Sequence, residues 1–407
     1  MNFVFVSPHF PNNYFRFCKA LKENGVHVFG IADQPYELLD PRLKDSLDDY
    51  YCVSDLKNYD EKYRAVAYFI SKHGRIDFLE SNNEFWMQDD AHLREDFNIN
   101  SGPKLDQVKY FRHKSLMKEK YKLANIKTAR FTLFKNKDDC LKFINEVNYP
   151  VIVKPDDGVG SSFTYKISNE NQLDAFLAKK EKEFKDRQYI MEEFIDGELI
   201  SLDGVCDSHG NIIYPTHHVF PLPIMDVVVE YTDVYYYTSK TIPEDLLKQG
   251  QAIIKAFGAK SRFFHLEFFR LTKDSHLGKK GQLYGLEVNM RVPGGYTPDM
   301  IDFAYSIDIY KIWADMIAFD KNKEDCSYPP LYCAYIGRRF DADYKHSMDE
   351  INNKYHNYIC YEDKNPPVLA DGMGDYFAMA KFKTLDEVYD FFHFGLERNH
   401  KAKLAKL

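Results

Sequence analysis

The stretch LYGLEVNMRVPGG, residues 283–295, combines an apolar strand pattern with three polar side chains. Glu287, Asn289 and Arg291 are spaced two residues apart. Because side chains alternate between the two faces of a strand, all three point to the same face. A strand that presents a carboxylate, an amide and a guanidinium on one face indicates a polar binding site.

A second strand pattern, RFFHLEFFRL, carries another carboxylate, Glu267. Glu267 and Glu287 are equally far from residue 277, the middle of the loop between the strands, so a symmetric hairpin places them opposite each other. Like charges in that position are destabilising. Two carboxylates and the Asn289 amide make an oxygen-rich site that suits Mg²⁺ together with substrate phosphates. The alternative is a solvated acidic face with Lys or Arg nearby.

The composition indicates a soluble globular protein of two or three domains, with 407 residues of which 44% are hydrophobic and 29% charged. A net charge of −8 without a long Lys/Arg block argues against nucleic acid or a membrane surface as partner. No apolar run approaches the ~18 residues of a membrane span. The seven cysteines are scattered and include no Cys-x-x-Cys pair. Because the N-terminus shows no signal-peptide pattern either, we expect a cytoplasmic location.

The order of elements predicts an α/β and α+β multidomain fold. Residues 1–104 alternate strand and helix, as in a parallel βαβ domain, but lack the Gly-x-Gly-x-x-Gly loop of NAD or FAD sites. Residues 105–190 form a helical connector and a small α+β unit. Residues 191–320 are richer in strands and close with one helix over 301–319, and residues 321–407 form a C-terminal α+β portion.

The sequence ESNNEF (80–85) ends the fourth predicted strand of the first domain. It places Glu80, Asn82 and Glu84 where open α/β sheets bind ligands. The alternative is helix capping by Asn82 or Asn83, with Glu84 in the first turn. Both interpretations stay open from sequence alone.

The sequence VIVKPDDGVGSSFTYKI (151–167) reads as strand, Gly-rich loop, strand. Lys154 ends the first strand, and Gly160, Ser161 and Ser162 offer backbone N–H groups and hydroxyls that suit phosphates. The loop is not a Walker A motif, because no Gly-Lys-Ser/Thr opens a helix. An ordinary hairpin turn is the alternative.

The sequence IMEEFIDGELISLDG (190–204) leaves one predicted subdomain and enters the next. Such a hinge exposes backbone groups that can face an adenine edge, and Glu198 follows within reach of a ribose hydroxyl. By itself the segment is an unremarkable acidic strand.

Together and in this order, the motifs resemble the ATP-grasp superfamily: Lys114, Lys154 before the Gly/Ser loop, MEEFI, Glu267 and EVNMR. The resemblance covers residues 1 to about 320, with the βαβ unit as the usual preceding domain. The segment LEVNMRVPGGYTPDM is most similar to the carboxylate–amine ligase branch, which includes amino-acid ligases. One departure is Phe163, which follows the serines where the family usually has Gly.

The resemblance implies ATP as cofactor together with Mg²⁺, for which Mn²⁺ is an alternative. Lys114 and Lys154 would contact the phosphates, Glu192 the adenine amino group, the Ile195 backbone the ring, and Glu198 the ribose. The Gly/Ser loop with Gly160, Ser161 and Ser162 would cover the phosphates.

On the central strands, the resemblance implies that Glu267, Glu287 and Asn289 bind two Mg²⁺. Arg291 would stabilise the transferred phosphoryl group as the catalytic residue. The implied reaction forms an acyl phosphate, which an amine attacks to give an amide or peptide bond with release of ADP and phosphate. The α+β unit at about 128–190 would close as a lid.

The expected partners are a small carboxylate and a small amine, and a homodimer is left open. Other acceptors, a kinase reaction and non-catalytic ATP binding remain alternatives. The candidate substrate contacts are Glu84, His217, Gly294, Gly295 and Arg338. His217 is either a base or ligand, or a structural histidine, and Arg338 is either a carboxylate anchor or a surface arginine.

Overall fold

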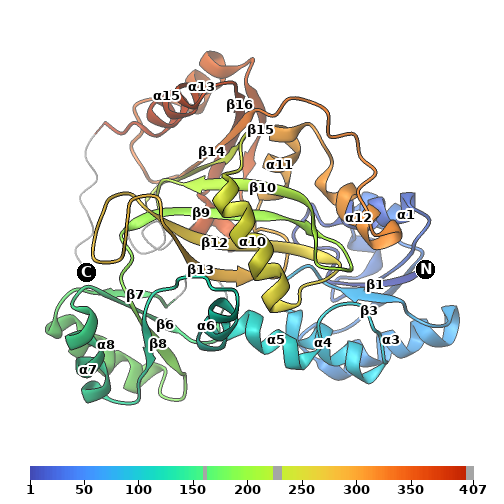
Figure 1. Cartoon of the computed structure of the whole chain (residues 1–407). Coiled ribbons are helices and arrows are strands. Elements are labelled where there is room, and N and C mark those ends of the chain that lie inside the picture. The colour runs from blue at the N-terminus through green and yellow to red at the C-terminus, as the bar shows by residue number, and fades with distance from the viewer. Residues whose placement is uncertain (159–162, 223–231, 400–407) are drawn as a thin grey trace.

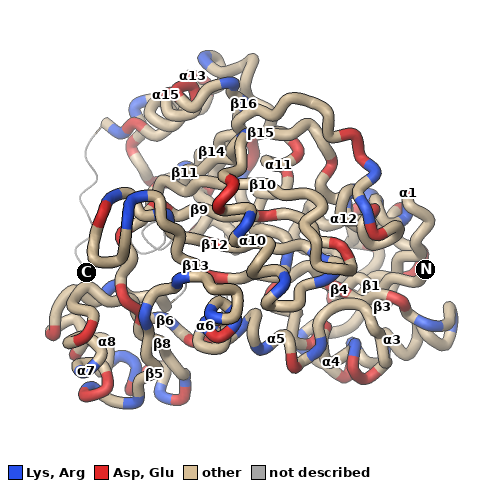
Figure 2. Tube along the Cα trace, viewed as in Figure 1, with Lys and Arg blue, Asp and Glu red and all other residues tan. Residues whose placement is uncertain are grey.

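A computed structural model describes residues 1–158, 163–222 and 232–399. In Figure 1 the N-terminal domain lies at the right, a small α+β lid at the lower left, and a large sheet between and above them. Figure 2 shows Lys and Arg interspersed with Asp and Glu over the described parts, in keeping with the absence of a basic block in the sequence. No helix among the described residues is long and apolar enough to cross a membrane.

The N-terminal domain is a four-stranded sheet of order β3-β2-β1-β4, and every pairing in it is parallel. The parallel sheet predicted from the βαβ rhythm is therefore confirmed. Its strands are β1 (Asn2–Val6), β2 (His27–Ala32), β3 (Asp49–Cys52) and β4 (Phe78–Glu80). Its helices are α1 (Phe15–Glu23), the 3₁₀ turn η1 (Tyr36–Leu38), α2 (Pro41–Ser46), α3 (Tyr59–His73) and α4 (Met87–Asp96).

Two connector helices, α5 (Leu105–Arg112) and α6 (Lys114–Leu123), lead from this domain to the lid. The lid is an antiparallel sheet of order β5-β8-β6-β7 with two helices. Its elements are β5 (Phe131–Leu133), α7 (Lys137–Val147), β6 (Val151–Pro155), β7 (Tyr165–Ile167), α8 (Glu170–Glu183) and β8 (Tyr189–Glu193).

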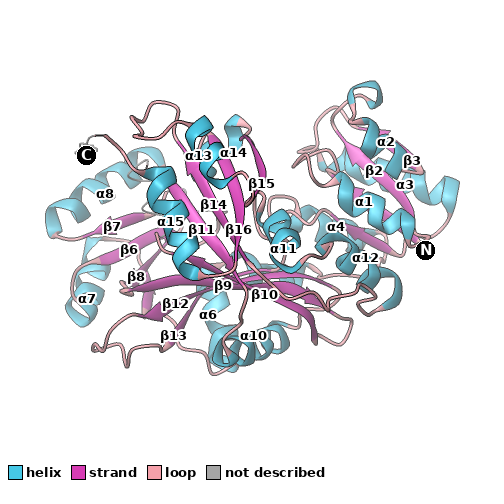
Figure 3. Ribbon diagram, turned by 90° about the horizontal axis from the view of Figure 1, so that it is seen from above, coloured by secondary structure: helices cyan, strands magenta, loops and turns pink. Residues whose placement is uncertain are grey.

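The central sheet has eight strands in the order β13-β12-β9-β10-β11-β14-β16-β15. They are β9 (Gly197–Cys206), β10 (Ile212–Phe220), β11 (Val234–Ser239), β12 (Arg262–Leu271), β13 (Leu283–Asn289), β14 (Tyr332–Arg338), β15 (Ile359–Lys364) and β16 (Tyr376–Phe382). Because β14 pairs with β11, the C-terminal strands continue this sheet, as Figure 3 shows from above. The accompanying helices are α10 (Glu244–Phe257), α11 (Thr297–Tyr305), α12 (Ile309–Phe319), α13 (Met348–Tyr355), α14 (Pro367–Met373) and α15 (Leu385–Leu396).

The single helix predicted over 301–319 is wrong, because the structure has α11 and α12 with a break between them. Ser306 adopts the left-handed conformation at φ 54° and ends α11. Asp308 then caps α12, since its carboxylate accepts hydrogen bonds from the backbone N–H groups of Tyr310 and Lys311. The helical spacing of apolar residues on both sides of Ser306 and Asp308 concealed this break.

A cluster of aromatic rings joins the N-terminal domain to the central sheet. Trp313 on α12 is 1% exposed. Its ring centroid lies 5.7 Å from Phe3 on β1, 5.1 Å from Phe17 on α1 and 6.3 Å from Phe263 on β12. One indole therefore contacts both domains, and its packing holds the N-terminal domain against the sheet.

Replacing Trp313 by Ala is expected to lower the free energy of unfolding by about 3–5 kcal/mol, because it empties a fully buried ring site. Trp313→Phe keeps most of the ring contacts and should lose clearly less. Urea unfolding followed by far-UV circular dichroism compares both variants with the wild type. Equal midpoints for Trp313→Ala and the wild type would show that the domains are joined by other contacts.

Candidate active site

A cavity of about 510 Å³ lies between the lid sheet and the β12–β13 end of the central sheet. Strands β6 and β8 line it from the lid, and β9, β12 and β13 line it from below. Most of the residues singled out in the sequence meet here. They are Lys114, Lys154, Glu192, Ile195, Glu267, Glu287, Asn289, Arg291 and Gly294.

The hairpin predicted from its loop midpoint is confirmed. Strands β12 and β13 are antiparallel, with Glu267 opposite Glu287 and His265 opposite Asn289. A register shift follows Glu267, on the loop side of this row. The polar row is therefore held by regular backbone pairing on the side that faces the cavity.

Glu287 receives its counter-charge from the connector helix. Lys114 Nζ lies 3.2 Å from Glu287 Oε1. Burial opposes ionisation of Glu287, but the nearby Lys114 and Lys154 outweigh it and lower the pKa of this carboxyl. Glu287 is therefore a carboxylate at neutral pH and is able to bind a cation.

The donor set fits a hard metal ion that shares its coordination with a ligand. Two carboxylates and one amide, from Glu267, Glu287 and Asn289, line the same cavity. Within residues 1–158, 163–222 and 232–399, no group of three or more His, Cys, Asp and Glu side chains is placed to hold a metal ion by itself. An incomplete oxygen set is what Mg²⁺ uses when phosphates and water supply its remaining ligands.

A buried ion triad forms the opposite wall. Glu192 Oε1 lies 2.6 Å from Lys118 Nζ, and Glu192 Oε2 lies 2.7 Å from Lys154 Nζ. Burial would raise the pKa of Glu192, but the two lysines outweigh it and lower that pKa to about 2. The Glu192 carboxylate thus neutralises both lysines, and its contact with an adenine amino group stays a prediction.

Lys118 was missed in the sequence, although a signal for it exists. It follows Lys114 by four residues on α6, so both project from one helix face. With Lys154, three lysines that form ion pairs line the cavity, and Lys166 is a fourth lysine in its lining. The site has more positive charge than the motif residues alone supply, which suits a polyphosphate.

Arg291 is held from the N-terminal domain. Its Nη2 and Nε atoms lie 3.0 and 3.3 Å from Glu84 Oε2. Burial raises the pKa of Glu84, and the Arg291 charge partly offsets this shift. Glu80 Oε2 instead accepts from Arg94 Nη2 at 3.0 Å and from Arg262 Nη2 at 3.2 Å. Glu80 therefore links its own domain to β12 of the central sheet. Of the two carboxylates of ESNNEF, Glu84 is the one bound to Arg291.

Glu198 requires a correction. It alternates with Leu199 along β9, and Leu199 lines the cavity, so the Glu198 side chain points to the opposite face of the sheet. There Glu198 lies across from Arg270 of β12. Burial raises the pKa of Glu198, and Arg270 partly offsets that shift. The geometry contradicts the predicted ribose contact.

Other substrate candidates lie apart from the cavity lining. The Arg338 guanidinium donates to the His346 carbonyl at 2.7 Å and stacks 3.7 Å from the Tyr344 ring centroid. It is thus bound within the C-terminal portion. Gly295 follows the cavity residue Gly294 at φ 60°. The predicted loop residues Gly160, Ser161 and Ser162 lie outside the described part of the chain.

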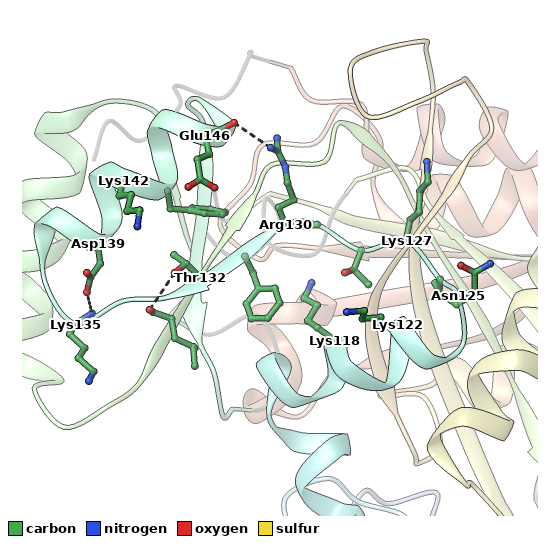
Figure 4. Close-up of a pocket in the computed structure, with 16 residues that line it drawn as sticks. Lys118, Lys122, Asn125, Lys127, Arg130, Thr132, Lys135, Asp139, Lys142 and Glu146 are labelled. Carbon is green, nitrogen blue, oxygen red and sulfur yellow. Dashed lines mark hydrogen bonds between the residues drawn. The ribbon is translucent and has the colours of Figure 1, made fainter.

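A second pocket is lined by residues of α6, of the segment 125–130, of β5 and of α7 (Figure 4). It is lined by Lys122, Lys127, Arg130, Lys135 and Lys142 among others. It shares Lys118 and Ala129 with the first cavity but contains none of the β12–β13 carboxylates. The residues expected to bind Mg²⁺ and the transferred phosphoryl group therefore line the first cavity.

A family model described as an ATP-grasp domain matches residues 147–299, which include the lid strands and the β12–β13 hairpin. This segment, residues 147–299, is similar to ATP-grasp domains. Among its relatives, an L-arginine-specific L-amino acid ligase from Bacillus subtilis is 23% identical over 269 residues. That match covers 65% of this chain and 63% of the relative, which is less than two thirds of its length.

Solved structures share the fold over nearly the whole chain. L-amino acid ligase from Bacillus licheniformis superimposes with a TM-score of 0.70 at 14% identity, covering 96% of each chain. The biotin carboxylase domain of a 2-oxoglutarate carboxylase from Hydrogenobacter thermophilus, in complex with MgADP and bicarbonate, gives 0.68 at 17% identity. It covers 96% of this chain and 88% of that one. At these identities the likeness shows the fold.

His217 lies on β10, with its Nδ1 2.8 Å from the Ser201 carbonyl. Burial lowers the pKa of His217 to about 4. The unfolded chain binds a proton at this imidazole near pH 6.5, whereas the folded protein binds it only near pH 4. The imidazole is therefore neutral in the folded protein at pH 7.

The wild type is accordingly expected to lose stability as the pH falls from 6.5 to 4, by up to about 1.4 kcal/mol per pH unit through His217. His217→Gln removes this contribution. Urea unfolding of both proteins at pH 7, 6 and 5 measures the difference in slope. Parallel pH dependences would mean that folding does not lower the pKa of His217.

Proposed function

We propose that the protein is an ATP-dependent ligase that joins a small carboxylate to an amine and releases ADP and phosphate. One observation carries the proposal: a single cavity combines lysines of the connector and lid with Glu267, Glu287, Asn289 and Arg291 of the central sheet. Phosphate-binding charges and an oxygen-rich metal site thus face each other. The names of the L-amino acid ligases among its relatives support the amine acceptor.

The nucleotide is placed by charge and by apolar contact. Ile152, Leu199, Phe269 and Leu286 line the cavity between the two sheets and suit a purine ring, beside the backbone of Ile195. The three lysines then take the phosphates. Bound at the β12–β13 row, Mg²⁺ would neutralise phosphate charge and orient the terminal phosphoryl group.

The first step activates the acid. An oxygen of the substrate carboxylate attacks the terminal phosphorus of ATP, the bond to the bridging oxygen breaks, and ADP leaves. The guanidinium of Arg291 stabilises the charge on the transferring oxygens, and Glu84 orients that guanidinium. The product is an acyl phosphate, which water would hydrolyse.

The second step forms the amide. The lone pair of the amine attacks the acyl carbon, phosphate leaves, and the nitrogen loses its extra proton. The lid, to which strands β6 and β8 belong, excludes water from the intermediate during this step. A kinase or a ligase with another acceptor shares the first step and differs in the second.

Release of ADP and AMP from MgATP, measured against a panel of carboxylates with hydroxylamine as trap, tests the proposal. Carboxylate-dependent ADP together with a hydroxamate is the expected result, because hydroxylamine captures the acyl phosphate. AMP release would show adenylation and overturn the mechanism. Nucleotide binding without turnover over a broad acceptor panel would favour a non-catalytic protein.

Glu287→Gln is expected to lower kcat by about 10²–10³-fold, because it removes one charge of the metal site while keeping the volume next to Lys114. The surface substitution Glu181→Gln on α8 serves as control and should leave kcat unchanged. Rates are measured over a Mg²⁺ titration. Full recovery of kcat at saturating Mg²⁺ would show that Glu287 is not required for the step.

A further inference from the structure

A buried carboxylate lies behind the proposed metal site. Asp203 on β9 has a fully buried side chain. Its Oδ2 accepts from Ser201 Oγ at 2.5 Å and lies 2.7 Å from His218 Nδ1. Its Oδ1 is hydrogen-bonded to His265 Nδ1. Two imidazoles and a hydroxyl therefore converge on one carboxylate in the interior.

His265 extends this network to the cavity. Its second ring nitrogen, Nε2, lies 3.0 Å from Glu267 Oε1. On β12 these two residues are two positions apart and share a face. The residues directly across from His265 and Glu267 on the neighbouring strand β9 are Asp203 and Ser201, respectively. The backbone register of adjacent strands thus builds a continuous row from the interior to the cavity.

The row has a defined direction of hydrogen bonding. Both ring nitrogens of His265 face carboxylate oxygens, which accept and do not donate, so the imidazole carries a proton on each nitrogen. One oxygen of Glu267 is fixed by this donor, and the second remains for a ligand in the cavity.

We propose that His265, oriented by Asp203, positions the Glu267 carboxylate for a divalent cation bound together with the nucleotide. His265 and Asp203 are positioning residues, since they act through Glu267. The inference rests on the metal role that the proposed function gives to Glu267. It assigns to two buried side chains the task of setting the rotamer of a metal ligand.

Stability alone does not account for these residues. Buried ion clusters are generally no more stabilising than apolar side chains of the same volume. His218 Nε2, moreover, is buried without a hydrogen-bond partner among the described residues. Partners behind a metal ligand, by contrast, typically change metal affinity by 10–100-fold when removed.

The test measures Mn²⁺ binding by electron paramagnetic resonance with ADP present, using the full chain. His265→Asn should raise the Kd for Mn²⁺ by about 10–100-fold. Binding of ADP in EDTA should be unchanged, which also shows that the cavity is folded. An unchanged Kd for Mn²⁺ in His265→Asn would overturn the proposal.

A conservative variant separates positioning from general packing. The side-chain amide of His265→Gln reaches towards the position of Nε2 and should restore part of the Mn²⁺ affinity. A structural role predicts instead that both variants lose thermal stability and Mn²⁺ affinity in parallel. That parallel loss would contradict the inference.

Two further variants test the order of the row and the site itself. Asp203→Asn should weaken Mn²⁺ binding, and the double variant with His265→Asn should bind no more weakly than His265→Asn alone, because Asp203 acts through His265. Additive losses would overturn this order. If Glu267→Gln leaves the Kd for Mn²⁺ unchanged, the metal assignment of the proposed function fails, independently of His265.

Discussion

The facing of Glu267 and Glu287 across the β12–β13 pairing is the constraint on which the rest of the site depends. Two carboxylates on neighbouring strands repel each other, so the fold has to supply positive charge near them. Without a ligand, Lys114 supplies it for Glu287 and His265 for Glu267. The first comes from the connector helix and the second from the sheet itself. The ion pair between Lys114 and Glu287 therefore favours packing of α6 against the hairpin.

The same logic explains why three parts of the chain meet at one cavity. The N-terminal domain contributes Glu84 to Arg291, and its packing is fixed by the aromatic cluster around Trp313. The lid contributes Lys154 and Glu192, which pair with each other. The lid thus brings charges of both signs, and the carboxylate from the N-terminal domain is paired with Arg291. A chain with a net charge of −8 can thus concentrate lysines at one place.

Local sequence patterns predicted features set by strands that follow each other in the chain. They failed for features set by pairing between segments far apart in the sequence. The loop midpoint gave the hairpin register because β12 and β13 are consecutive strands that pair antiparallel about one loop. Glu198 was misassigned because the face it occupies depends on how β9 meets β12. Asp203 and Lys118 escaped notice because their partners come from other strands or from the lid. The helix break at Ser306 lies within a helical apolar pattern, and its local signal is Asp308, which caps α12.

Nucleotide binding in such a site is an exchange of ion-pair partners. Lys118 and Lys154 both face Glu192, and Lys114 faces Glu287. A polyphosphate that enters offers these ammonium groups new acceptors, and a divalent cation offers the carboxylates a new counter-charge. Because only the two replacements together keep the interior neutral, neither alone is as favourable as the pair. Under the proposed function, this charge arrangement would couple metal binding to nucleotide binding through electrostatics.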